Sequence, residues 1–187
     1  QRNLTLADRF VDVRIETDKE QARDYRVPVE INLRPGPEKR LKIGAGYGTD
    51  TGPRFSVNYR DKNIVDAGHY WDAGVNVSKV LQGLALGYTV PGKDMRTFTS
   101  LGVNLKRDNP DTYDTKEFSL ELQYVRPYIL DKTGAVFLQL LREDSDAGNA
   151  RTNTFSLMPG FRLFDRWYDH PTRPTRGYSY LAEVRGT

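Results

Sequence analysis

Apolar and polar residues alternate one by one through much of this 187-residue sequence. Successive side chains of a β-strand point to opposite faces, so a period of two predicts strands with one apolar face and one polar face. The clearest run alternates four apolar residues with a lysine and three glycines: Leu41, Ile43, Ala45 and Tyr47 against Lys42, Gly44, Gly46 and Gly48. The alternation resumes over 55–60 after the turn-forming segment 49–53, which predicts a hairpin. The pattern therefore favours a fold that is mainly β.

The same alternation predicts about nine strands from residue 40 onward. They lie at 41–47, 55–60, 70–78, 84–90, 101–106, 118–124, 135–142, 154–163 and 178–185. Strands of roughly 8 to 12 residues suit a membrane crossing at a tilt, which needs about 9–11 residues. The polar segments 107–116 and 143–151 are predicted to be long loops between strands.

The first forty residues show a different pattern of predicted elements. Residues 10–15 and 27–33 read as two short strands on either side of the polar segment 17–26, and residues 4–9 are predicted to end a helix. This order indicates the end of a small α+β module. Pro35-Gly36-Pro37 then marks a boundary, because proline and glycine punctuate chains between folded units. We therefore predict a module at 1–34, a linker at 35–39 and a second domain at 40–187.

Composition excludes several classes of function. The sequence has no cysteine, which excludes disulfide frameworks, cysteine-ligated metal centres and cysteine nucleophiles. Its 28 basic and 25 acidic residues are interspersed without a long basic run, so no nucleic-acid partner is expected. The most apolar stretch, 135–141, is far shorter than the ~18 residues of a membrane helix. The hydrophobic share of 37% is low for a large packed core.

Two kinds of protein explain the alternation, and the residues alone leave both open. In a soluble barrel or sandwich the apolar sides face a core, whereas in a membrane barrel they face lipid and the lumen is polar. Aromatic residues lie near several strand ends, as in the interfacial girdles of membrane barrels. They are also common in any sheet. These residues are Tyr47, Tyr59, Trp71, Tyr88, Tyr124 and Tyr178.

Few residues point to catalysis or metal binding. The only histidines are His69 and His170, and Ser78, which follows His69 on one predicted strand, has no nucleophile signature around it. The acidic clusters 108–111 and 144–146 lack the spacing of a calcium loop. We expect no enzymatic activity, metal or cofactor. Arg173 and Arg176 suit either an anionic lipid such as lipopolysaccharide or an ordinary polar turn.

Three segments resemble one family, the outer-membrane insertase superfamily of bacteria. Val27-Pro28-Val29-Glu30 and the run from Ile43 to Arg54 resemble the end of a POTRA module and the first barrel strand of its TamA-like branch, with BamA more distant. The segment 170–178 resembles a Pro-x-x-Gly turn before a later strand of the family. This resemblance implies a sixteen-stranded transmembrane barrel in the outer membrane. The chain would supply about nine of its strands, preceded by the end of a periplasmic POTRA module.

The resemblance also implies functional residues and partners. The lateral-gate strand, through which β-barrel or autotransporter clients enter the membrane, comprises Leu41, Lys42, Ile43, Gly44, Ala45, Gly46 and Tyr47. The family turn motifs comprise Asp50, Gly52, Pro53, Arg54, Pro174 and Gly177. Implied partners are unfolded outer-membrane proteins, a TamB-like periplasmic protein, membrane lipid and lipopolysaccharide.

The chain departs from the family pattern at its last residues. The family's lid-loop motif is not visible, because Val184-Arg185-Gly186-Thr187 lacks the aromatic residue, and no closing C-terminal strand follows. The chain is therefore expected to be part of a longer protein. A passive outer-membrane pore and a soluble β-barrel that binds a small apolar ligand remain as alternatives.

Overall fold

The computed structural model describes residues 10–17, 26–49, 51–64, 66–94, 96–128, 132–148, 150–169 and 173–186. The predicted helix end at 4–9, most of the polar segment 17–26, Asp50 and residues 170–172 lie outside the described residues. The chain divides into two compact units, Gln1–Lys39 and Arg40–Thr187.

The first unit contains a two-stranded antiparallel sheet. β1 (Phe10–Thr17) pairs with β2 (Val29–Pro35), and the register places Val13 opposite Leu33 and Ile15 opposite Ile31. The two strands predicted from the alternation are therefore confirmed. Val13 is buried, whereas Ile31 and Leu33 remain exposed.

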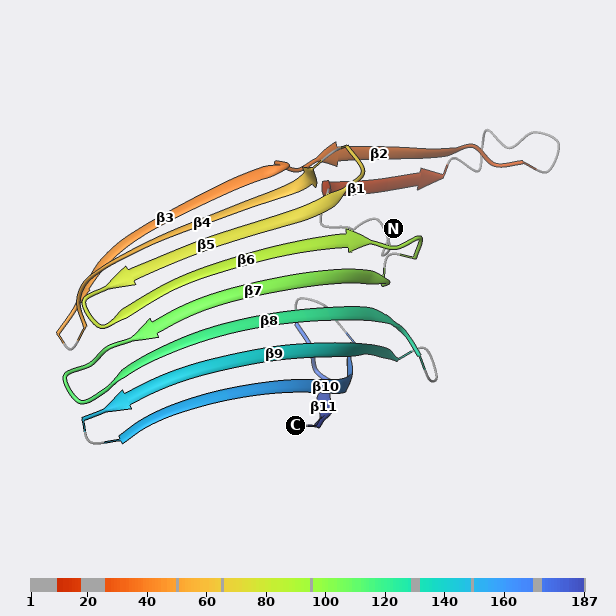
Figure 1. The fold of residues 1–187 in the computed structure, drawn as a ribbon. Helices are drawn as coiled ribbons and strands as arrows, with labels where there is room; N and C mark the ends of the chain where they lie inside the picture. Colours follow the sequence, from red (N-terminus) through yellow and green to blue (C-terminus); the bar gives the residue numbers. More distant parts are fainter. Residues whose placement is uncertain are drawn as a thin grey trace. The chain divides into compact units, whose positions relative to one another are not determined.

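The second unit is a curved sheet of nine strands in which each strand lies beside its neighbour in sequence (Figure 1). The nine predicted strands are confirmed, and most extend beyond their predicted ends. Their bounds are β3 (Lys39–Gly48), β4 (Gly52–Ile64), β5 (His69–Ser78), β6 (Leu81–Pro91), β7 (Phe98–Asp108), β8 (Asp114–Pro127), β9 (Thr133–Ala147), β10 (Ala150–Tyr168) and β11 (Gly177–Arg185).

Strand connections lie at two ends of this sheet. We call the end at which β3 begins the entry end, and the end at which β3 finishes the far end. Connections 65–68, 92–97, 128–132 and 169–176 lie at the entry end, and 49–51, 79–80, 109–113 and 148–149 at the far end (Figure 1).

The two predicted long loops are wrong in extent, because strands occupy half of 107–116 and most of 143–151. Only 109–113 separates β7 from β8, and only 148–149 separates β9 from β10. Polar side chains bond across the extended strands: Arg107 donates two hydrogen bonds to Asp114 at 3.0 and 2.8 Å. The hydroxyls of Thr115 and Ser145 are 3.0 Å apart. In these two segments, polar side chains on both faces therefore belong to strands that extend beyond their apolar residues. They do not indicate a loop.

The register separates the sheet into one apolar face and one polar face. Directly paired residues share a face, and the pairs Tyr88–Leu101, Leu101–Leu122 and Leu122–Leu138 carry an apolar row across four strands. One residue further along, Gly87 pairs with Gly102, Gly102 with Glu121, and Glu121 with Gln139. The alternation predicted from the sequence is thus continued across neighbouring strands.

The polar face is the concave one. On a concave face side chains converge, and here they reach over an intervening strand: Arg185 of β11 bonds Gln139 of β9 at 3.5 Å, and Arg162 of β10 is 4.0 Å from Glu121 of β8. The buried apolar residues of this sheet also occupy that face. Val125 and Phe137 are each 2% exposed and belong to its register rows. The apolar rows therefore cover the convex face.

Gly177 begins β11 at a point where the chain has no room for a side chain. A Cβ added there would lie 2.5 Å from the Trp167 carbonyl oxygen and against the Tyr168 ring. The backbone oxygen cannot move aside without breaking the β10–β11 pairing, which joins Tyr168 to Gly177. The close approach explains why glycine follows the Pro174 turn.

We expect Gly177→Ala to destabilise the full-length protein by about 1–3 kcal/mol, because the new methyl group overpacks against a fixed backbone atom. Equilibrium urea unfolding measures the difference. Gly186→Ala is the matched control, since a Cβ at Gly186 meets nothing within 4 Å. Equal stability of the two variants would contradict the steric requirement for glycine at position 177.

Candidate functional site

β3 forms one edge of the nine-stranded sheet, and β4 is its only strand neighbour within the described part of the chain. The backbone groups on its other side are therefore available to a further strand. Convex side chains of this edge are among the most exposed apolar groups of the protein, with Leu41 60%, Ile43 65% and Tyr47 74% exposed. All seven predicted gate residues lie on this strand.

The concave side of β3 contributes little side-chain packing. A Cβ at Gly44 would lie 2.7 Å from the Ser56 hydroxyl oxygen, and one at Gly46 would lie 3.3 Å from the Arg54 Nε. Side chains of β4 thus occupy the space beside both glycines. A pocket is lined by Gly44, Gly46, Ser56 and neighbouring residues of β4–β6. Backbone pairing, with little help from side chains, holds this half of β3 to β4.

The predicted turn motifs do not form one site. Gly52 has a φ of +68° at the far end and begins β4, where Pro53 and Arg54 follow. Pro174 and Gly177 lie at the entry end, around the start of β11. Because the two turns are at opposite ends of the sheet, each shapes its own hairpin.

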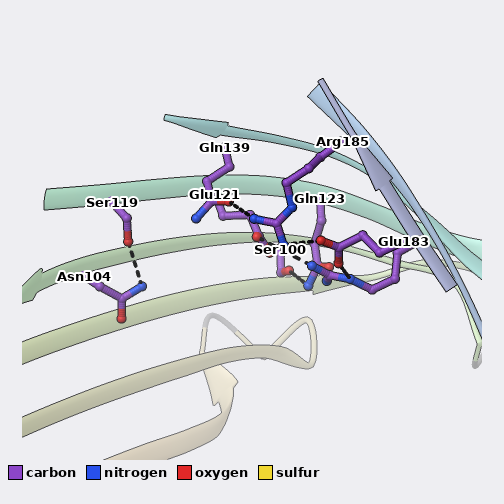
Figure 2. Close-up of polar contacts among 9 residues, drawn as sticks. Ser100, Asn104, Ser119, Glu121, Gln123, Gln139, Glu183 and Arg185 are labelled. Atoms are coloured by element: carbon purple, nitrogen blue, oxygen red, sulfur yellow. Dashed lines mark hydrogen bonds and ion pairs between the residues drawn. The ribbon is translucent and has the colours of Figure 1, made fainter. Parts of the chain in front are cut away.

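A polar network covers the concave face of β7–β11 (Figure 2). Gln123 donates to the Ser100 hydroxyl at 2.8 Å, and Arg162 donates to Glu183 at 2.6 Å. Arg185 also bonds Glu183. The sequence marked several of these residues as polar strand positions but did not bring them together, because only the register brings β8, β9 and β11 close.

Cations gather on the concave face near the entry end. Arg40, Lys42 and Arg60 line a pocket whose floor is made of small residues. Asp72 forms an ion pair with Arg60. The floor comprises Gly74, Ala85, Gly87 and Gly102. The concave face beside β3 therefore carries a basic pocket.

Aromatic side chains line the convex face near the entry end. Trp71 pairs directly with Tyr88, whose hydroxyl is 2.6 Å from the His69 Nδ1. On the last two strands Trp167 stacks on Tyr178, with ring centroids 6.3 Å apart. A row of Trp and Tyr at one margin of an apolar face is the arrangement of an interfacial girdle.

Polar and charged groups accompany that aromatic row. Lys132 donates to Asp165 at 2.5 Å and to the Tyr178 hydroxyl at 2.6 Å. The Tyr178 hydroxyl also donates to Asp165, at 2.8 Å. Amphipathic rings with polar tips thus lie where the apolar face ends.

The residues considered for catalysis do not meet. His69 begins β5 and points to the convex face, whereas Ser78 ends the same strand on the concave face. The Ser78 hydroxyl instead accepts from the Leu81 backbone at 2.8 Å, which caps the turn. Among the described residues no cluster of three acidic or histidine side chains is arranged to hold a metal ion. No helix in the described part of the chain is long and apolar enough to cross a membrane.

Comparison with known protein families finds no family model that matches this chain. The structure is similar to the crystal structure of BamA from Haemophilus ducreyi lacking POTRA domains 1–3, with a TM-score of 0.67 and 12% sequence identity. The likeness covers 98% of this chain and 40% of that chain, so this chain spans less than half of the BamA structure. It shows a shared fold, and the predicted partial antiparallel β-barrel is confirmed.

Proposed function

We propose that this chain belongs to the TamA-like branch of the outer-membrane insertase superfamily and forms part of the wall of a sixteen-stranded barrel in a bacterial outer membrane. The full-length protein then helps to insert β-barrel or autotransporter clients through a lateral gate at β3. The observation that carries this proposal is a BamA-like sheet whose convex face is apolar and whose concave face is polar, with the glycine-rich strand β3 at one edge of its described part.

The convex face supports a lipid environment. Apolar area costs about 25 cal/mol per Å² in water, and side chains such as Leu122 and Val136 are half exposed there. On β8 this zone runs from Phe118 to Tyr124 between Lys116 and Arg126. Together with these two flanking charges the segment has 11 residues, which matches the ~9–11 residues of a tilted membrane strand. A soluble barrel would place its apolar face inside, where this sheet has its polar network.

The position of β3 supports the gate, because the strands that complete the proposed barrel would meet the sheet at this strand. An unpaired strand entering hydrocarbon leaves each backbone group unsatisfied at a cost of several kcal/mol. β3 offers such a strand a hydrogen-bonding partner by β-augmentation. Because Gly44 and Gly46 provide no side chains to pack, β3 separates from its neighbours at lower cost than a strand with packed side chains.

The Val27-Pro28-Val29-Glu30 motif and the two-stranded sheet of the N-terminal unit support a role in binding a partner. We assign residues 1–34 to the end of a periplasmic POTRA module that contacts a TamB-like protein. Deleting 1–34 from the full-length protein is expected to abolish pull-down of that partner. Retained pull-down would contradict this role.

We expect Ile43→Cys in the full-length protein to form disulfide adducts with cysteines in the terminal strand of an autotransporter client, because Ile43 lies on the strand that is proposed to pair with the client. Non-reducing electrophoresis of stalled assembly intermediates detects them. Leu101→Cys is the control: its side chain is also exposed on the convex face, but β7 is paired on both sides.

If Ile43→Cys forms adducts only at background level, the proposal that clients pair with β3 at a lateral gate is wrong. Ion conductance of the purified protein in planar bilayers, together with normal client assembly in a deletion strain, would instead support the passive pore.

Orientation gives an independent test. If β3 rises from the periplasm, the far end faces outward, so a cysteine at Asp111 in the 109–113 connection is expected to react with a membrane-impermeant maleimide on intact cells. A cysteine at Lys93, in the entry-end connection of similar length, is expected to react only after the outer membrane is permeabilised. The opposite labelling pattern would overturn the orientation.

A further inference from the structure

A shallow pocket crosses the convex face of β5–β9 close to the far end. Its floor follows one cross-strand row: Val75 pairs with Leu84, Leu84 with Leu105, and Leu105 with Phe118. The next residue in this row is Arg142 of β9. The row thus consists of four apolar residues followed by one basic residue.

A second row borders this floor on the side toward the far-end connections. Gln82 pairs with Arg107, Arg107 with Lys116, and Lys116 with Asp144. Together with Arg142, the two convex rows carry three of the pocket's four basic residues, on three consecutive strands. Strands lie about 4.8 Å apart, so the cations extend over ~10 Å beside the apolar floor.

The three cations are not equally available. Arg107 is engaged by Asp114 at 2.8 Å, and Arg142 by Asp144 at 3.3 Å. Asp144 also accepts from Asn153. Among the described residues Lys116 forms no hydrogen bond or close ion pair, and only a longer-range attraction links it to Asp114. Three cations and two carboxylates leave one positive charge in excess, and Lys116 supplies it.

We propose that this pocket binds the lipid A part of lipopolysaccharide, with acyl chains on the Val75–Phe118 floor and sugar phosphates on Lys116 and Arg142. The assignment rests on the proposed membrane orientation, in which the far end meets the outer leaflet. An apolar floor directly below a row of cations matches an amphiphile whose headgroup is anionic. Cations on three strands match two phosphates on a disaccharide better than the single phosphate of a glycerophospholipid.

The concave face provides a matched control at the same depth. Lys106 lies next to Arg107 in sequence and pairs with Glu117, the neighbour of Lys116. Its side chain therefore points to the opposite face of the same two strands. Lys106 is also among the residues that line the pocket, but Lys106→Gln removes its charge from the concave face, away from Lys116 and Arg142.

The test measures binding of purified lipid A to the full-length protein in lipid nanodiscs. A basic side chain near an anionic membrane surface changes affinity about five-fold, so Lys116→Gln is expected to weaken binding about five-fold and Lys116→Gln with Arg142→Gln about 25-fold. Lys106→Gln and the charge-preserving Lys116→Arg are expected to bind like wild type. Circular dichroism and heat-modifiable mobility confirm that each variant is folded.

Several outcomes would overturn the proposal. They are equal loss for Lys106→Gln, no loss for the double variant, and equal loss of phosphatidylglycerol binding, which would identify a general anionic-lipid surface. Client assembly is measured on the same variants. Because the pocket lies away from β3, assembly by the double variant is expected to stay at the wild-type rate, so failure of lipid A binding and failure of the gate are separate results.

Discussion

The hydrogen-bonding register between neighbouring antiparallel strands is the constraint on which the rest of this structure depends. Each strand alternates its side chains between two faces, and direct pairing aligns those alternations from β4 to β11. A slip of one residue between β8 and its neighbours β7 and β9 would place Leu122 beside polar groups and Glu121 beside leucines. The two chemically opposite faces therefore exist only because eight neighbouring strands keep one register.

The curvature of the sheet gives the side chains on its two faces different surroundings. On the concave side Arg162 and Arg185 reach across an intervening strand and hold Glu121, Glu183 and Gln139 in one network. On the convex side the apolar groups diverge and stay half exposed. The edge strand β3 follows the same two-faced plan, yet its backbone is paired on one side and its concave positions are largely glycine. The proposed membrane wall, gate and lipid pocket thus draw on one geometry.

Sequence periodicity predicted every strand of the sheet, because burial on one face requires a period of two wherever the strand meets its surroundings. It failed at 107–116 and 143–151, where both faces are polar and the period disappears. There the strands persist through contacts such as Arg107 with Asp114, between residues that sequence patterns treat independently. The pocket of Lys116 and Arg142 was missed for the same reason, since its rows join residues of five strands.

The sequence by itself determined that the chain is mainly β, where its strands lie, and that the first barrel strand is glycine-rich, because these properties follow from neighbouring residues and backbone preference. It could not decide whether the apolar faces point inward or outward, since alternation is identical in both cases. Only the tertiary structure decided this, because the direction of curvature is a property of all the strands together. Curvature placed Phe137 and Glu183 inside and Leu101 and Leu122 outside.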